Sequence, residues 1–345
     1  MKRYFSIFLA ILLSLSLAAC GDTTAKNTDK QPEVSEKKEQ TTEEKKEDTS
    51  KDKKTIVQSL NGPTSMGLAK LITEQRAMDK SDYDFEIVKM ATDVVQGLIK
   101  GDVDIAAIPA NLASTVYNKS AGKVQVAAIN TLSVVYIVDN DGTINSVEDL
   151  RGKTIYATGQ GQTPEYILNE VLSKNGLEIG KDVNVEYKAE ATEVASILAS
   201  EENVVAMLPQ PFITVTQTKN DKVKVAIDLN DEWKALHNGD IVTGVLVVNK
   251  EYAEKNKESF NKFLDDYKAS VEYVKANPDQ ASKMIEDLDI VKAPIAKKAL
   301  PDMNIVYIDG QELKANLSEY LGILNEANPA SIGGAMPAED FYYNR

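Results

Sequence analysis

A short stretch, residues 149–168, constrains the fold of this chain more than any other part of the sequence. It opens with an Asp-Leu-Arg-Gly turn, continues with strand-like alternation from Lys153 to Ala157, and then places glycines at Gly159 and Gly161. Glycine tolerates positive φ and leaves the backbone uncovered. Thr163, which is followed by proline, is typical of a helix N-cap. The stretch therefore predicts a strand, a bare turn and the start of a helix.

The same strand–turn–helix pattern recurs along the chain. A strand over residues 55–60 is followed by a polar turn and by an expected helix over residues 66–76. A Gly-Asp-Val-Asp turn at 101–104 leads into a buried strand that ends at Pro109. Alternating strands and helices are typical of parallel βα units. We therefore expect an α/β fold with two mostly parallel sheets flanked by helices.

Two continuous apolar strands divide the folded region into two lobes. Residues 134–138 are an uninterrupted apolar run and residues 241–248 are apolar apart from Thr243 and Gly244, as expected of buried strands. We interpret them as the strands by which the chain leaves a first lobe and later returns to it. Closure about this two-strand hinge is the expected motion. The predicted boundaries are residues 55–138 and 243–345 for lobe 1 and residues 139–242 for lobe 2.

The N-terminus predicts export and a lipid anchor. Residues 1–20 have a basic start, an apolar run too short for a permanent membrane span, and a Leu-Ala-Ala-Cys ending. This signal peptide resembles one with a bacterial lipobox, in which Cys20 takes lipid such as palmitate and becomes the mature N-terminus. A cleaved signal with an incidental cysteine is the alternative. Cys20 is the only cysteine, which excludes a disulfide framework and a cysteine-based metal site.

Residues 21–54 are predicted to form a disordered tether. They consist mainly of charged and small polar residues, and Val34 is their only large aliphatic residue. Such a tether would hold the folded region near the extracytoplasmic face of the membrane, with the lipid as the only membrane contact. The whole chain has a formal net charge of −14, which argues against binding nucleic acid or anionic lipid directly.

Residues 149–155 and the Gly-Gln-Gly turn at 159–161 resemble the second-lobe entry of ABC-importer substrate-binding proteins. The closest group comprises the nitrate, taurine, alkanesulfonate and thiamine-precursor binders. Residues 101–108 and the Pro-Gln-Pro-Phe segment at 209–212 fit the same pattern, which extends over residues 55–327. The resemblance implies a bilobed periplasmic-binding-protein fold of type II. It also implies capture of a small polar or anionic solute between the lobes and delivery to permease and ATPase subunits.

An alternative function is a lipoprotein sensor or adhesin with the same fold and no transport partner. We expect a monomer, with no enzyme activity, no cofactor and no metal. The single histidine, His237, has no partner that the sequence identifies, and no acidic pair has the spacing of a calcium or zinc motif. The lack of cysteine after residue 20 departs from the thiamine-precursor branch, so pyrimidine synthesis is not expected.

Ten residues at the ends of predicted strands are candidate ligand-binding residues. Ligands of α/β folds bind at the carboxyl ends of strands, beside helix N-termini whose N–H groups are unpaired. Side-chain amides both donate and accept, which suits a polar organic molecule as well as an oxyanion. Each candidate has a structural alternative as a helix cap, core residue or solvent-exposed loop residue. The candidates are Thr64, Ser65, Met66, Asn111, Gln160, Gly161, Gln162, Thr163, Gln210 and Pro211.

Overall fold

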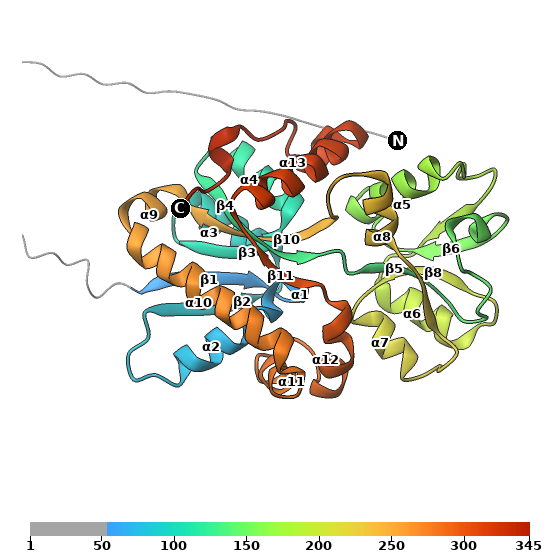
Figure 1. Ribbon diagram of the computed structural model, residues 1–345, viewed down its shortest axis with the longest axis horizontal. Coiled ribbons are helices and arrows are strands. Elements are labelled where there is room, and N and C mark those ends of the chain that lie inside the picture. Colours follow the sequence, from blue (N-terminus) through green and yellow to red (C-terminus); the bar gives the residue numbers. More distant parts are fainter. Residues whose placement is uncertain (1–53) are drawn as a thin grey trace, which may run out of the picture. The chain divides into compact units, whose positions relative to one another are not determined.

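Two β-sheets organise residues 54–345, the part of the chain that the computed structural model describes (Figure 1). The predicted signal peptide, Cys20 and the tether up to residue 53 lie outside the described residues. The first sheet has the order β11-β4-β10-β3-β1-β2 and the second has the order β7-β6-β8-β5-β9. We define lobe 1 as the six-stranded sheet with its helices, and lobe 2 as the five-stranded sheet with its helices.

The first sheet is covered on both faces. Successive residues of β3 alternate between two hydrophobic clusters, with Ala106 and Ile108 in one and Ile105 and Ala107 in the other, because side chains of a strand point to opposite faces. Its strands are β1 (Thr55–Leu60), β2 (Tyr83–Val88), β3 (Ile105–Pro109), β4 (Val124–Leu132), β10 (Val242–Asn249) and β11 (Ile305–Ile308). Its helices are α1 (Pro63–Met66), α2 (Ala69–Arg76), α3 (Ala91–Lys100), α4 (Ala110–Lys119), α9 (Lys250–Lys255), α10 (Lys257–Ala276), α11 (Pro278–Asp287), α12 (Ala293–Ala299) and α13 (Gly310–Ala327).

The second sheet follows the same principle on a smaller scale. In β5, Tyr136 and Val138 belong to a cluster confined to lobe 2, whereas Ile137 belongs to the cluster that continues into lobe 1. Its strands are β5 (Val135–Asp139), β6 (Thr154–Ala157), β7 (Asn184–Tyr187), β8 (Val205–Pro209) and β9 (Lys224–Asp228). Its helices are α5 (Thr163–Lys174), α6 (Ala191–Ser200), α7 (Phe212–Gln217) and α8 (Leu229–Leu236), with the short 3-10 turn η2 (Val147–Leu150). The 3-10 turns η3 (Leu300–Asp302), η4 (Pro329–Ile332) and η5 (Glu339–Phe341) pack on elements of lobe 1.

The expectation of mostly parallel sheets was wrong, because both sheets are mixed. Strand β1 is parallel to β2 and β3, and β6 is parallel to β7 and β8. The ladders that involve β5, β10 and β11 are antiparallel. Strand β5 follows β4 almost directly and enters the other sheet without a helical crossover. Parallel pairing of consecutive strands needs such a crossover. The two crossing strands, β5 and β10, belong to no such pair, and all their neighbours in the sheets are antiparallel.

The predicted exit from lobe 1 after residue 138 was also misplaced. Strand β5 pairs with β8 and β9, so the chain leaves the first sheet after Leu132. The return falls at Val242, where β10 begins, one residue before the predicted position. The apolar run at 134–138 correctly indicated a buried strand. Apolar character reports burial and does not say which of two sheets buries the strand.

The sequence also predicts helices over residues 278–287 and 310–327, and these coincide with α11 and α13. The helix expected over 66–76 is instead divided into α1 and α2. From the sequence, the stretch that contains Asp231, Trp233 and His237 is predicted to be irregular, whereas the structure forms helix α8 there. The Asp228 side chain caps this helix by accepting the N–H of Asn230 at 2.8 Å. Trp233 of α8 contacts Tyr320 of α13, so this helix of lobe 2 packs against lobe 1.

Candidate functional site

The first candidate turn, at the end of β1, is closed onto its own strand. The hydroxyls of Thr64 and Ser65 both donate to the carbonyl oxygen of Leu60, at 2.9 and 2.6 Å. Both residues are buried, and Met66 is a core residue of lobe 1 with 1% of its surface exposed. These side chains therefore shape the turn, and Met66 packs in the core.

This turn meets the strand that leads out of lobe 1. The Asn130 amide of β4 donates to the carbonyl oxygen of Thr64 at 3.4 Å. Across the sheet, a Cβ atom at Gly244 would lie 2.4 Å from Asn130 Oδ1 and 2.6 Å from Thr64 Cγ2. A side chain at position 244 would thus displace the turn, so glycine allows β10 to approach it. Asn130 is thus a neutral hydrogen-bonding residue near the end of β4, just before the chain crosses into lobe 2.

Gln210 joins the two lobes at the end of β8. Its side chain is buried, Nε2 donates to Asp302 Oδ2 at 3.3 Å, and Oε1 accepts the hydroxyl of Thr214 at 2.9 Å. The Tyr136 hydroxyl of β5 donates to the carbonyl oxygen of the same Asp302 at 2.8 Å. Asp302 belongs to η3 in lobe 1, so both bonds cross between lobes. We call Tyr136, Gln210 and Asp302 the polar contact.

The polar contact is acidic. Burial raises the pKa of Asp228, at the end of β9, and the negative charges of Asp231 and Asp302 add to this shift. Burial also raises the pKa of the Tyr136 phenol, and the charges of Asp228 and Asp302 act in the same direction. These shifts indicate that carboxylates of both lobes lie close to one another in partly buried surroundings.

The second-lobe turn after β6 has the backbone that the sequence predicts. Gly159 and Gly161 have φ angles of 82° and 71°, in the left-handed region that favours glycine. The Gly161 N–H donates to the carboxylate of Glu165, and the Tyr166 hydroxyl donates to the Gly161 carbonyl oxygen at 2.9 Å. The Asn328 amide of lobe 1 donates to the Tyr166 hydroxyl at 2.7 Å. This turn is therefore tied to lobe 1 through Tyr166.

The predicted N-cap of the following helix was off by one residue. Helix α5 begins at Thr163, and the residue before it, Gln162, makes no side-chain capping bond. Gln160, Gly161 and Gln162 are exposed, and Thr163 is partly buried. The one-residue shift leaves the strand–turn–helix arrangement as predicted, since proline remains in the first turn of the helix.

Asn111 lies in the first turn of α4, where its amide donates to the carbonyl oxygen of Ser331 at 3.3 Å. Ser331 belongs to η4, and η4 begins directly after Asn328. The segment 328–332 therefore contacts Asn111 directly and Gly161 through Tyr166. The structure brings the candidates together in two groups. One group contacts segment 328–332, and the other lies around Gln210 and β4, the strand that leads out of lobe 1. Pro211, which precedes α7, is partly buried beside Gln210.

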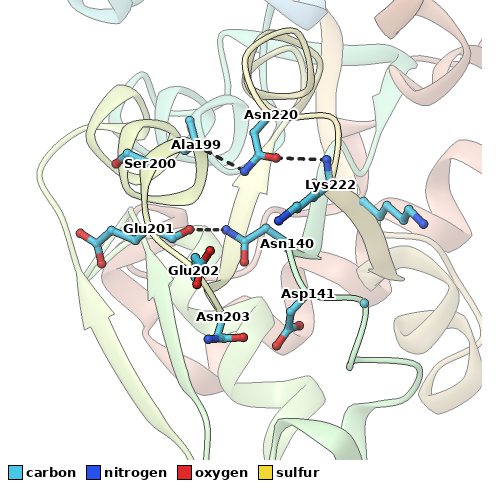
Figure 2. Close-up of a pocket in the computed structure, with 11 residues that line it drawn as sticks. Asn140, Asp141, Ala199, Ser200, Glu201, Glu202, Asn203, Asn220 and Lys222 are labelled. Carbon is cyan, nitrogen blue, oxygen red and sulfur yellow. Dashed lines mark hydrogen bonds between the residues drawn. The ribbon is translucent and has the colours of Figure 1, made fainter.

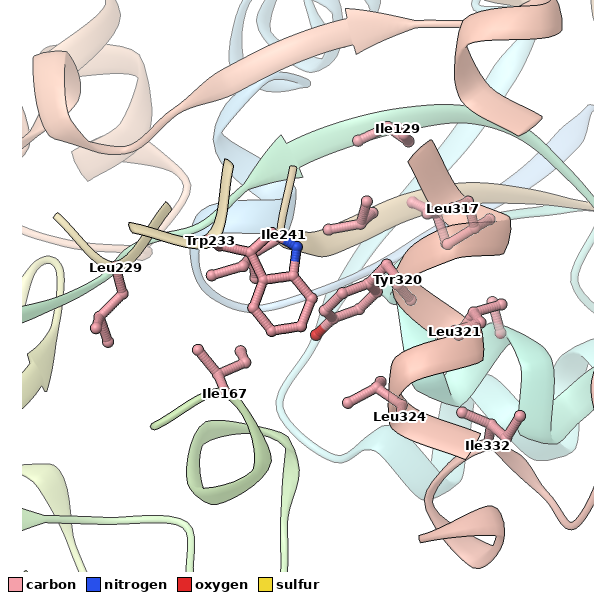
Figure 3. Close-up of a cluster of buried hydrophobic side chains, with 14 of the residues drawn as sticks. Ile129, Ile167, Leu229, Trp233, Ile241, Leu317, Tyr320, Leu321, Leu324 and Ile332 are labelled. Carbon is pink, nitrogen blue, oxygen red and sulfur yellow. The ribbon is translucent and has the colours of Figure 1, made fainter. Parts of the chain in front are cut away.

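A hydrophobic cluster also joins the lobes (Figure 3). Trp233 of α8 packs on Tyr320 of α13, with ring centroids 5.9 Å apart at an angle of 64°. Ile167 of α5, Ile241 and Leu317 complete what we call the apolar seam, and all five residues are buried. Two hydrogen bonds flank it, from the N–H of Asn238 to Glu319 at 3.0 Å and from the N–H of Asp240 to Asn316 at 3.1 Å.

A cavity of about 570 Å³ lies elsewhere, beside the start of β8, whereas Gln210 follows the end of that strand (Figure 2). Its lining includes Asn140 and Asn220, whose amides donate to carbonyl oxygens at the end of α6 and just after it. Both asparagines are thus engaged in holding the end of α6. None of the ten candidate residues lines this cavity.

Two features are absent from residues 54–345, the part of the chain that the structure describes. No group of three or more His, Cys, Asp or Glu side chains in this region is arranged to hold a metal ion. No helix in the same region has the length and apolar character needed to cross a bilayer.

Sequence reasoning missed Tyr136, Glu165, Asp302 and Asn328, the residues that contact the candidates. Glu165 had a detectable signal, since it lies three residues after Gln162, the spacing of a capping box. The sequence places Tyr166 beside Ile167, Val171 and Leu172 on the apolar face of the predicted helix, and this pattern gives no sign of the bonds that its hydroxyl makes. Asp302 and Asn328 are far from Gln210 and Tyr166 in sequence, so only the tertiary fold reveals these pairs.

Comparison with known proteins gives a family match for part of the chain. Residues 123–281 match the model described as "NMT1/THI5 like", which covers lobe 2 and the adjoining strands and helices of lobe 1. A search among curated proteins finds no match to the sequence.

Solved structures match over most of the chain. An ABC transporter protein from Parabacteroides distasonis superposes with a TM-score of 0.71 at 21% identity, covering 85% of this chain and 100% of that one. The periplasmic aliphatic sulphonate binding protein SsuA from Escherichia coli gives 0.65 at 15% identity, covering 84% and 92%. A ligand-binding component of an ABC-type import system from Staphylococcus aureus gives 0.61 at 17% identity, covering 84% and 96%.

At these identities the structural likeness concerns the fold. It agrees with the family match and with the resemblance carried by residues 149–161. The chain therefore has the bilobed periplasmic-binding-protein fold, and its residues 123–281 match the NMT1/THI5-like family, as the sequence resemblance predicted.

Proposed function

We propose that this protein is an extracytoplasmic, lipid-anchored solute-binding protein of an ABC importer. It would capture a small polar solute between its two lobes and deliver it to permease and ATPase subunits. The observation that carries this proposal is the arrangement of the two sheets. The ends of β1 in lobe 1 and of β6 and β8 in lobe 2 lead into polar turns, and the end of β3 leads directly into α4. Hydrogen bonds from the turn after β8 and from the adjoining β5 and α5 cross between the lobes.

The candidate residues differ in how they would contribute to the site. Gln160, Gly161 and Gln162 are exposed, so the second-lobe turn offers both backbone and side-chain groups to a solute. Gln210 lies where the lobes meet, and one of its two amide hydrogens would remain available beside the bond to Asp302. Thr64, Ser65 and Asn111 hold turns of lobe 1, and we assign them the shaping of its surface. Thr163 and Pro211 hold the starts of α5 and α7.

The anchor is a separate part of the proposal. Cys20 lies outside the described residues, so its support is the Leu-Ala-Ala-Cys sequence alone. Growth of cells with a fatty-acid analogue should label the protein, and Cys20→Ala should abolish the label. Labelling that persists in the variant would contradict lipidation at Cys20.

Transport is tested by solute uptake. The solute should first be identified by thermal unfolding of residues 52–345, which form one compact unit, against a chemical library. Deletion of the gene should then reduce uptake of the stabilising solute, and a copy with Cys20 intact should restore it. Normal uptake in the deletion strain would favour a sensor or adhesin role for the same fold.

A further inference from the structure

The charge of the solute can be argued from the residues where the lobes meet. This argument rests on the proposed solute-binding function and concerns the same site. The relevant groups are the carboxylate at the second-lobe turn, the carboxylates at the polar contact, and the lysines and arginines around them. The named relative from Escherichia coli binds aliphatic sulphonates, but at 15% identity that preference does not transfer to this chain.

The second-lobe turn already holds a carboxylate of its own chain. Glu165 accepts the N–H of Gly161, at the start of the 12-residue helix α5. The N–H groups and dipole at a helix start favour negative charge, and here Glu165 supplies that charge. The carbonyl oxygen of Gly161 is fixed by Tyr166. An anionic solute at this turn would meet a like charge and would compete with Glu165 for the backbone donor.

The polar contact lies on the other side of the crossing strands, and there too a carboxylate of the chain accepts a hydrogen bond from the chain itself. The carboxylate of Asp302 accepts the Gln210 amide, the one side-chain amide among the candidates of this group. Asp228 and Asp231 lie close enough for their charges to act on the same surroundings. A solute that enters here meets negative charge again. An anion would be repelled, whereas a donor on a neutral or cationic solute would find carboxylate and amide acceptors.

No cation offsets these carboxylates within residues 54–345. None of Glu165, Asp228, Asp231 and Asp302 forms an ion pair with a lysine, arginine or histidine in that region. Lys188, which follows β7, is paired with Glu186 at 2.6 Å and lies 5.4 Å from the centre of the Tyr156 ring. No lysine or arginine is thus paired with the carboxylates at these turns.

We propose that the site selects a neutral or positively charged polar solute and rejects small anions. Selection would come from the carboxylates of Glu165 and Asp302 and from the side-chain amide of Gln210. The candidate solute is a hydrogen-bonding molecule with amide, amine or heterocyclic nitrogen donors. Sulfonates, nitrate and sulfate would be excluded by like charge.

The first experiment identifies the charge of the bound solute directly. The full chain is purified from its membrane, unfolded, and the released small molecules are identified by mass spectrometry. A neutral or cationic molecule released in proportion to the protein supports the proposal. An anionic molecule released in that proportion overturns it. A failure of the proposed transport function would give a different result: uptake of the released solute would remain normal after deletion of the gene.

The second experiment applies when no molecule is released. Binding of benzoate, benzamide and benzamidine, which share one ring and differ in charge, is measured by ligand-observed NMR, together with ethanesulfonate and nitrate. We expect no saturable binding of benzoate, ethanesulfonate or nitrate to the wild-type protein. Saturable binding of any of these anions that the neutral benzamide does not displace overturns the proposal.

Two variants complete the test. The substitutions Glu165→Gln and Asp302→Asn each remove a negative charge that would repel an anion. In the double variant that carries both, the apparent affinity for ethanesulfonate should rise by about tenfold or more. Glu178→Gln, which removes an exposed carboxylate of lobe 2 that is paired with Lys181, is the matched control and should not change it. Equal weak binding of ethanesulfonate to the double variant and the control would contradict the assigned roles of Glu165 and Asp302.

Discussion

The two lobes are joined on one side by the apolar seam and on the other by the polar contact. Figure 1 shows α5, α8 and α13 together on one side of the crossing strands, and α7 and α12 on the other. Trp233 and Tyr320 are almost fully buried in the apolar seam. In the polar contact, Gln210 and Tyr136 each make one hydrogen bond to Asp302. Separating the seam would expose large apolar surface, whereas the polar groups would regain water as partner.

The difference indicates which side of the molecule moves. Opening the apolar seam would cost the transfer of several large side chains into water, which is a substantial part of the stability of a domain. Opening the polar contact exchanges protein hydrogen bonds for bonds with water at small net cost. We therefore expect rotation about the apolar seam and the crossing strands, with the polar contact breaking and forming as the lobes open and close.

The largest expected effect comes from the apolar seam. Trp233→Ala should lower the free energy of unfolding by about 3–5 kcal/mol, because it removes a buried aromatic side chain from the cluster shared by both lobes. Urea unfolding of residues 52–345 measures this loss. Trp233→Phe is the control and should cost clearly less. A loss below about 1 kcal/mol for the alanine variant would show that the seam is not a stable joint.

A smaller effect is expected at the polar contact. Gln210→Glu places a carboxylate against Asp302 in buried surroundings, which should cost about 1–3 kcal/mol and separate the lobes on that side. Small-angle scattering should show a larger radius of gyration at neutral pH, with recovery as the pH falls and the new carboxyl becomes protonated. An unchanged radius with full stability would mean that the polar contact does not hold the lobes together.

The third effect concerns the link through Tyr166. Tyr166→Phe keeps the ring and removes the hydroxyl that joins Gly161 to Asn328, so we expect a loss of about 0.5–1.5 kcal/mol. Amide hydrogen exchange should become faster in residues 158–162. Tyr343→Phe removes a hydroxyl bond to Asn261 within lobe 1 and is the matched control. Equal exchange rates at 158–162 in the two variants would remove Tyr166 from the link.

The smallest effect is a pH dependence at Asp228. Because burial raises its pKa in the folded protein, the charged form costs stability at neutral pH. This cost shrinks as the pH falls below the folded pKa and is absent below the ordinary pKa of an aspartate. Asp228→Asn retains a helix cap and should stabilise the protein by about 0.5 kcal/mol at neutral pH. The gain should shrink toward acid pH. A gain that grows on acidification would reverse the assigned direction.

The sequence predicted the elements better than the contacts between them. The left-handed Gly159 and Gly161 and the bounds of α11 and α13 depend on local preferences, and these were correct. The placement of β5 was wrong because its apolar run fits either sheet. Trp233 was assigned to an irregular segment, although it lies in a helix at the centre of the seam.

The candidate site shows the same limit. Position at the end of a strand correctly located the turns at Thr64, Gly161 and Gln210. It could not show that Thr64 and Ser65 turn inward, because their partner is a carbonyl of their own strand. Asp302 and Asn328 lie 92 and 162 residues from the side chains that they contact, and no local pattern links them.

The central claim, that the lobes close on a solute by turning about the apolar seam, is tested most directly by two distances. Residues 52–345 contain no cysteine, so spin labels can be placed at exposed positions Lys219 and Lys298 across the polar contact, and Ser173 and Glu326 across the seam. Pulsed electron resonance is then measured with and without the solute that the protein releases. We predict that the first distance shortens with solute while the second stays constant. A change confined to the second distance, or no change in either, would contradict the account.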